Sequence, residues 1–313
     1  MSSTPTFSFI GEQKLSGDSI SKLLCNNIKT WIDISFVRTG GYDTVSLNEP
    51  AYDGTDLSAL TPIDDRVYGQ GYVYQSYFKN WIWENDIPEE GMTEPPVVCS
   101  GIWVGGDFYP REASGDMAYH VDYRNGRIIF DMWMAPDQVY GSGNVEVTAS
   151  FSYKRVYVAS DYELKQTIEN ISKYANNPIG SGENILDESK IPLPAVIVQE
   201  MSHSWDGYQL GGYKKCNHIV SATIFSARSI DGENIVDMLS QQENKKVPTI
   251  DWNDSETCFD EYGDVNASFS GVFESQSIYP WKDIYINETE GRKDKKGVYA
   301  GKVTFYIETS PHM

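Results

Sequence analysis

The sequence predicts an α+β fold made mostly of antiparallel β-sheets with a few packed helices. The first observation is Asn125-Gly126, which stands between two apolar, β-prone runs, residues 119–123 and 128–131. Asn-Gly is typical of a tight hairpin turn because both central residues of that turn need a positive φ. The second observation is residues 145–154, in which apolar and polar side chains alternate as in a strand with one buried face.

The alternating run changes phase after Lys154. Apolar side chains stand at odd-numbered positions from Val145 to Tyr153, and then at Val156 and Val158. A phase change of one residue indicates either a β-bulge or a strand that passes from one packing layer to another.

Three segments have the pattern of amphipathic helices. Residues 18–32 have Asp18 or Ser19 as a cap and an apolar stripe that includes Leu24 and Ile28. Residues 160–175 open with the capping box Ser160-x-x-Glu163. Residues 230–242 supply the third helix.

The remaining segments are mostly strands joined by turns. Further strands are predicted at residues 97–104, 195–198, 214–227, 284–286 and 303–307. Gly105-Gly106 and residues 209–212 are predicted turns. Residues 33–65 have the composition of a loop, and the aromatic-rich residues 72–83 fit a strand and a helix equally well.

We expect two domains. A chain of 313 residues is more typical of two domains than of one. Asn176-Asn177-Pro178 and Gly180-Ser181-Gly182 mark the best boundary, at about residues 176–190. Residues 1–180 then form a β-rich domain with the N-terminal helix and the Asn-Gly hairpin, and residues 190–313 form an α+β domain.

The charge balance argues against tight binding to nucleic acid. The net charge is −20 and the pI is about 4.5, whereas phosphate binding needs clustered Lys and Arg. A surface past which DNA slides stays compatible with this charge.

No apolar run has the roughly 18 residues of a membrane helix. The first residues lack the features of a signal peptide, so we expect a protein made and kept in a cytoplasm or released by lysis.

No motif indicates catalysis, a cofactor or a metal. The four cysteines have no CxxC spacing, and the sequence contains no Walker A, GxSxG or HExxH motif. Acidic loops such as Asp53–Asp56 do not match an EF-hand. We expect structural or solvent-facing roles for the histidines, His120, His203, His218 and His312. The sequence therefore predicts no enzyme, no catalytic residue, no cofactor and no metal ligand.

The aromatic content favours protein–protein contacts. The chain has 21 Tyr, 12 Phe and 8 Trp, and Tyr and Trp are enriched at interfaces. Aromatic density and turn position give the interface candidates Trp81, Trp83, Tyr208, Gln209 and Leu210. The alternative is a carbohydrate-binding or glycan-cleaving module, with Trp81 and Trp83 as the sugar platform and Glu84 as the acid.

Three segments resemble virion proteins of tailed bacteriophages. Residues 121–131, with NGRIIFD, and residues 145–154, with VxVxAxFSYK, resemble a pattern of neck and tail-connector proteins of myophages. Residues 193–198 with 208–212, followed by the strand to Phe225 and residues 237–242, are similar to the strand–strand–helix order of tail-terminator domains. The resemblance covers residues 119–250 and brings no catalytic residue with it.

The resemblance implies a structural virion protein in a ring at the head–tail junction, either in the neck or as the tail terminator. Its partners would be further copies of itself and other virion proteins of neck and tail. DNA would pass the lumen without tight binding, and no membrane would be involved. The protein would be located in the virion, assembled in the host cytoplasm. A baseplate or other tail structural protein is the nearby alternative.

Overall fold

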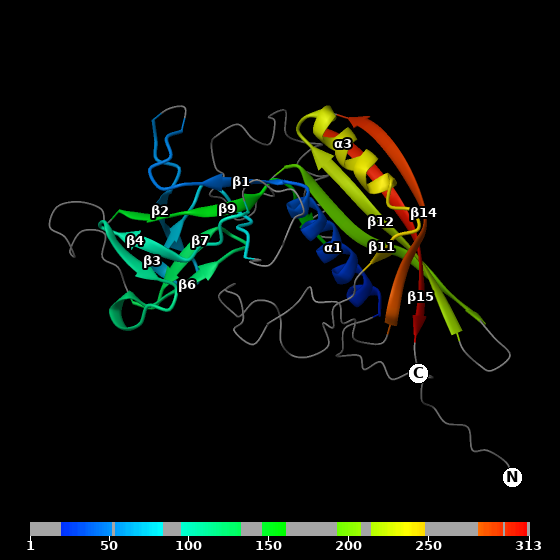
Figure 1. Ribbon diagram of the computed structural model, residues 1–313, viewed down its shortest axis with the longest axis horizontal. Coiled ribbons are helices and arrows are strands. Elements are labelled where there is room, and N and C mark those ends of the chain that lie inside the picture. The colour runs from blue at the N-terminus through cyan, green and yellow to red at the C-terminus, as the bar shows by residue number, and fades with distance from the viewer. Residues whose placement is uncertain are drawn as a thin grey trace, which may run out of the picture.

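The computed structural model describes residues 20–51, 54–83, 95–132, 146–160, 193–207, 214–247, 281–296 and 298–311. Two large sheets of mostly antiparallel strands and one small two-stranded sheet make up most of this part of the chain, and helices pack against one of the large sheets (Figure 1). The predicted α+β class with mostly antiparallel β-sheets is thereby confirmed. The likeness of the second part to a tail terminator stays a prediction.

The first sheet has seven strands in the order β5-β4-β8-β2-β3-β7-β6. Their bounds are β2 Ala59–Asp65, β3 Gly69–Gln75, β4 Gly101–Val104, β5 Asp107–Pro110, β6 Tyr119–Asp122, β7 Arg127–Phe130 and β8 Val147–Ala149. A short 3-10 turn, η1 (Gly115–Met117), precedes β6. Apolar side chains of these strands, such as Ile102 and Phe130, form one buried core together with Phe151, which follows β8.

The Asn-Gly hairpin is confirmed, but its turn is longer than the predicted one. β6 and β7 pair up to Asp122 opposite Arg127, so residues 123–126 form a four-residue turn. Gly126 has a positive φ of 64°, whereas Asn125 does not. The Asp122 carboxylate accepts hydrogen bonds from the Asn125 backbone N–H at 3.1 Å and from its side-chain amide at 2.8 Å. These bonds stabilise the longer turn and hold Asn125 away from the conformation that a two-residue turn needs.

The second sheet has six strands in the order β10-β11-β12-β15-β14-β13. Their bounds are β10 Tyr157–Ala159, β11 Ala195–Gly207, β12 Lys214–Ser226, β13 Lys246–Val247, β14 Trp281–Lys296 and β15 Val298–Pro311. β10 and β11 are parallel, and every other neighbouring pair is antiparallel.

Two helices share the core on one face of this sheet. α1 (Ile20–Arg38) lies against β10 and β11, and α3 (Ser229–Ser240) lies against β12, β15 and β14 (Figure 1). Leu24 and Ile28 of α1 and Val236 of α3 belong to one buried cluster with the sheet. Strand β12 and helix α3 thus confirm the predicted elements at residues 214–227 and 230–242.

Helix α1 is longer than the sequence predicted, because it is buried on two sides. Its first part packs on the six-stranded sheet, whereas Ile34 and Val37 of its last turns pack around Ile82. The loop predicted for residues 33–65 is therefore wrong in part. That range contains the end of α1, strand β1 (Tyr42–Val45) and strand β2. The helix predicted from residue 160 onward and the turn at 209–212 lie outside the described residues.

The phase change after Lys154 marks a passage from one sheet to the other. β8 belongs to the seven-stranded sheet, β9 (Phe151–Lys154) pairs with β1, and β10 belongs to the six-stranded sheet. Val147 and Phe151 are buried in the first core, and Val156 and Val158 in the second. Of the two predicted explanations, the structure has the passage between packing layers.

The predicted boundary at residues 176–190 lies outside the described residues, and the division into 1–180 and 190–313 stays a prediction. Two elements from before that boundary belong with the six-stranded sheet, because β10 is one of its strands and α1 packs on it. In the part of the chain that the structure describes, no helix is long and apolar enough to cross a membrane.

Candidate functional site

Trp81 and Trp83 lie at the junction between the two sheets. Trp81 is 1% exposed, its ring stacks on Phe151 with centroids 4.0 Å apart, and its Nε1–H donates to the Phe78 carbonyl at 3.0 Å. Trp83 is partly buried against the same core. Tyr208, Gln209 and Leu210 lie outside the described residues. Trp81 is thus a core side chain, and the assignment of all five residues to an interface stays a prediction.

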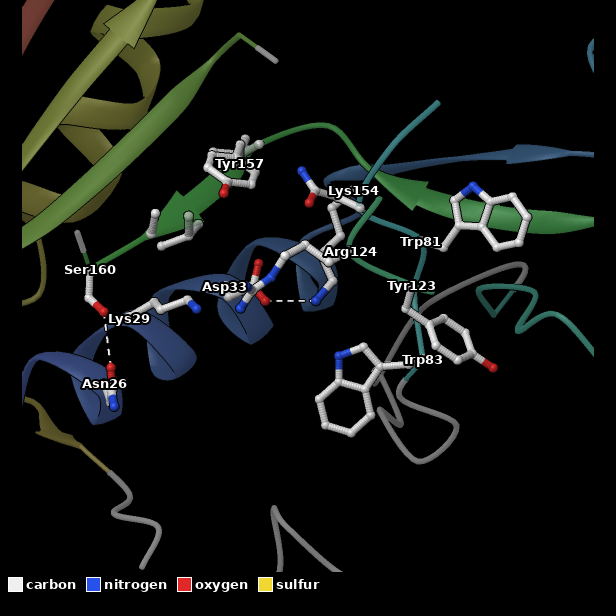
Figure 2. A pocket seen from close by; sticks show the side chains of 14 residues that line it. Asn26, Lys29, Asp33, Trp81, Trp83, Tyr123, Arg124, Lys154, Tyr157 and Ser160 are labelled. Atoms are coloured by element: carbon white, nitrogen blue, oxygen red, sulfur yellow. Dashed lines mark hydrogen bonds and ion pairs between the residues drawn. The ribbon is translucent and has the colours of Figure 1, made fainter. Parts of the chain in front are cut away.

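A pocket of about 270 Å³ opens beside these tryptophans, between α1 and the end of β9 (Figure 2). Its lining includes Asp33, Trp83, Arg124 and Lys154. Lys154 Nζ contacts Asp33 Oδ2 at 2.6 Å, and these side chains are 8% and 20% exposed. Because this ion pair joins a side chain of α1 to one of β9, we interpret the pocket as lying at a structural junction between the two elements.

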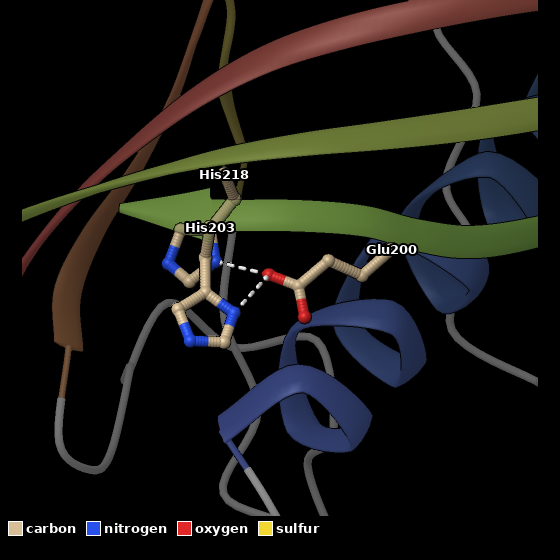
Figure 3. A group of neighbouring side chains, drawn as sticks. All are labelled: Glu200, His203 and His218. Atoms are coloured by element: carbon tan, nitrogen blue, oxygen red, sulfur yellow. Dashed lines mark hydrogen bonds and ion pairs between the residues drawn. The ribbon is translucent and has the colours of Figure 1, made fainter. Parts of the chain in front are cut away.

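A carboxylate and two imidazoles meet on strands β11 and β12 of the six-stranded sheet (Figure 3). His203 and His218 are direct partners across the two strands. Glu200 stands three residues before His203, and a β-bulge lies between Glu200 and Ser202. In a regular strand, residues three apart point to opposite faces. The extra residue Met201 restores the phase and brings Glu200 and His203 to one face.

The three side chains are close together and unequally exposed. Glu200 Oε1 lies 2.5 Å from His218 Nδ1 and 3.5 Å from His203 Nδ1. One potential ligand atom from each of the three residues lies within 4.8 Å of the other two. The His218 side chain is 0% exposed and Glu200 is 4% exposed, whereas His203 is 51% exposed. The cluster therefore has a buried floor and one side chain open to solvent.

Helix α1 packs against the strand that carries Glu200. Cys25 of α1 is buried, and burial raises the pKa of its thiol to about 12. A hydrogen bond with the Glu200 backbone lowers that pKa, and the negative charge of the Glu200 side chain raises it. Because only a thiolate is a good nucleophile, Cys25 is an inert core residue that fixes the backbone behind Glu200.

The sequence reasoning expected no metal ligand, and the cluster was missed. One signal was present, since a turn centred on residues 209–212 places His203 opposite His218. The face on which Glu200 lies depends on the bulge at Met201, and the sequence pattern did not indicate that bulge.

In the part of the chain that the structure describes, strands β11 and β14 have long stretches whose outer side carries no paired strand. Among the described residues, β11 is paired on its outer side only at Ala195–Ile197, and β14 only at Ile284 and Tyr285. Residues 198–207 pair with β12 and residues 286–296 pair with β15, and on their other side neither stretch has a strand from the described residues. Open edge groups readily pair with a strand from another chain.

Comparisons with known proteins add no relative. No protein-family model matches the chain, and no curated protein matches its sequence. Residue roles are therefore assigned from the contacts, burial and topology described above.

Proposed function

We propose that this chain is a non-catalytic structural protein of a tailed-phage virion, which forms a homo-oligomeric ring at the head–tail junction. The proposal is carried by two stretches of this sheet, residues 198–207 of β11 and 286–296 of β14, beside which the described part of the chain places no outer strand. They are different surfaces at opposite sides of one sheet, so copies that join through them associate head to tail. Head-to-tail contacts generate closed rings when the rotation between copies closes.

The directions of the strands suit such a contact. β11, β12, β15 and β14 are antiparallel in turn, so β11 and β14 run in opposite directions. When the sheet continues into a second copy, β14 of one copy therefore lies antiparallel to β11 of the next. The alternation of strand direction is kept across the contact.

The register of the two edges also matches. The residue partners can be followed across the sheet from β11 through β12 and β15 to β14. By this path His203 aligns with Ile286, and Val198 aligns with Gly291. Both edge strands carry one extra residue between these levels, because β11 has a bulge after Glu200 and β14 has one after Ile286. A single antiparallel register can therefore join residues 198–203 of one copy to residues 286–291 of the next.

The resemblance of residues 121–131 and 145–154 to neck and tail-connector proteins supports the kind of assembly. The net charge of −20 suits a ring through which DNA passes without adhering. The other partners would be virion proteins of neck and tail. A baseplate or other tail ring would use the same edges.

The carbohydrate-binding alternative lacks support, because Trp81 is 1% exposed and its ring is stacked on Phe151.

Disulfide cross-linking tests the register directly. In the proposed contact, Gln199 of one copy is opposite Glu290 of the next, so the double variant Q199C/E290C should form a ladder of covalent oligomers on oxidation. Within one chain, β11 and β14 are separated by β12 and β15 and lie about 14 Å apart, which is too far for a disulfide. The shifted variant Q199C/E288C is the matched control and should cross-link poorly.

Imaging decides the place of the ring. Immunogold labelling of particles should place the protein between capsid and tail, with native mass spectrometry giving a closed oligomer. A monomer at all concentrations together with equal cross-linking of the two variants would overturn the ring. Label at the distal end of the tail would overturn the head–tail position and favour a baseplate protein.

A further inference from the structure

We propose that Glu200, His203 and His218 bind one divalent transition-metal ion of the zinc type. One carboxylate oxygen and two imidazole nitrogens are a ligand set typical of such ions. This proposal does not require the ring, because binding depends on side chains that meet within one chain, although Glu200 and His203 also lie in the β11 stretch that the ring would pair.

The distances suit a small ion. Ligand atoms about 2.0–2.1 Å from a tetrahedral zinc ion lie about 3.3 Å from one another. Glu200 Oε1 lies 2.5 Å from His218 Nδ1 and 3.5 Å from His203 Nδ1. An ion between the three groups therefore requires a small widening of the first pair and a rotation of the half-exposed His203 ring.

The backbone holds two of the ligands in place before an ion arrives. Glu200 and His218 are buried on paired strands, and the Glu200 backbone also contacts Cys25 of α1. A site on strands of a packed sheet is more precisely positioned than one on loops. His203, which is 51% exposed, provides the path by which an ion enters from solvent.

The charges also favour a cation. Glu200 is 4% exposed, and a carboxylate is costly to bury unless a charged or hydrogen-bonding group compensates it. An imidazole that binds a metal does so in its neutral form, so a ligand set of one carboxylate and two imidazoles carries a single negative charge, which a divalent ion more than offsets. Three protein ligands leave a fourth position for water or for a group from another molecule.

The test is zinc and cobalt titration of the full chain after removal of metal with a chelator. Isothermal titration calorimetry should give one Zn²⁺ per chain, and Co²⁺ should give the visible absorption bands of a tetrahedral site. The variant H203A removes an exposed ligand and should weaken Zn²⁺ binding by at least about 10-fold. Zn²⁺ should raise the melting temperature of the unsubstituted chain and not that of H203A.

His120 provides the matched control. It also faces a carboxylate, with Nε2 3.0 Å from Asp131 Oδ1, but it lies on β6 in the other sheet. H120A should bind Zn²⁺ as the unsubstituted chain does. E200Q, which keeps the shape of the side chain, should lose binding even if other substitutions at the cluster disturb folding. No saturable binding, or equal binding by H203A and the unsubstituted chain, would overturn the proposal and leave an ordinary Glu–His hydrogen bond.

Discussion

Arg127 lies between two buried carboxylates and joins two hairpin turns. Its Nε contacts Asp122 Oδ2 at 2.7 Å, and its Nη1 contacts Asp65 Oδ2 at 2.9 Å. The side chains are 12%, 4% and 5% exposed for Arg127, Asp122 and Asp65. Asp65 also accepts hydrogen bonds from the backbone N–H groups of Val67 and Tyr68, and Asp122 holds the turn at 123–126. One guanidinium thus fixes the β2–β3 and β6–β7 turns to each other.

Removal of this guanidinium should be costly. We expect R127M to lower the free energy of unfolding by about 3–5 kcal/mol, because it leaves two buried carboxylates without their counter-charge. Urea denaturation followed by circular dichroism measures the difference. R228M is the control, since Arg228 pairs with Asp231 at the surface. A similar, small effect of both substitutions would show that Asp65 and Asp122 are well solvated.

The ion pair of Asp43 and Arg155 should make the free energy of unfolding depend on pH. The hydrogen bond from Arg155 lowers the pKa of Asp43 below its ordinary value of 3.8. As the pH falls, Asp43 therefore becomes protonated in the unfolded chain before it does in the folded chain. The stabilisation by the Asp43–Arg155 pair is present above about pH 4 and is lost as the pH falls through the folded-state pKa of Asp43. D43N should be less stable at pH 7, by less than about 1 kcal/mol for a half-exposed pair. The difference should shrink towards pH 3, and a constant difference would contradict the linkage.

At the scale of elements, the β6–β7 turn packs directly on the core. Gly126 has a φ of 64°, and a Cβ at this position would lie 2.1 Å from the Phe78 carbonyl oxygen. That oxygen also accepts the hydrogen bond from the Trp81 indole. The turn therefore needs glycine both for its backbone conformation and for the close approach to Phe78.

A pair of alanine substitutions separates these two requirements. G106A, in the β4–β5 turn, has a φ of 94° and no atom within 4 Å of the new Cβ, so only backbone strain is added. We expect a loss of about 1–2 kcal/mol for G106A. G126A adds a clash with backbone and should lose clearly more in the same denaturation experiment. Equal losses would mean that the Phe78 segment moves away at little cost.

Local patterns explain which elements the sequence could predict. The β6–β7 hairpin and the passage after Lys154 follow from side-chain alternation within a few residues. The end of α1 did not, because Ile34 and Val37 are buried against Ile82, which lies on a segment that the pattern left undecided. The Glu200 cluster needed both the pairing of His203 with His218 and the bulge at Met201, and only the pairing follows from the position of a turn.

At the scale of the whole molecule, the two sheets share elements. The run from β8 to β10 is continuous and enters both cores, and Lys154 on β9 is tied to Asp33 on α1. Trp81 lies in the first core, and Trp31 lies in the second, where it meets Phe305 edge-on at 6.3 Å. Each core therefore contains its own fluorescent reporter.

We expect the two sheets to unfold together. The difference in fluorescence between the unsubstituted chain and W31F isolates Trp31 and the second core, and the difference from W81F isolates Trp81 and the first core. Denaturation midpoints that agree with each other and with circular dichroism would indicate one cooperative transition. Two separate midpoints would contradict coupling through the run from β8 to β10 and α1.

The contact between Trp31 and Phe305 also has a consequence for synthesis on the ribosome. Helix α1 emerges well before the strand that carries Phe305, which follows roughly 270 residues later. At about 5–20 residues per second, the nascent helix waits for tens of seconds with its apolar stripe uncovered. During that interval α1 is a natural target for chaperones, and the sheet beneath it closes only when the last two long strands have left the exit tunnel.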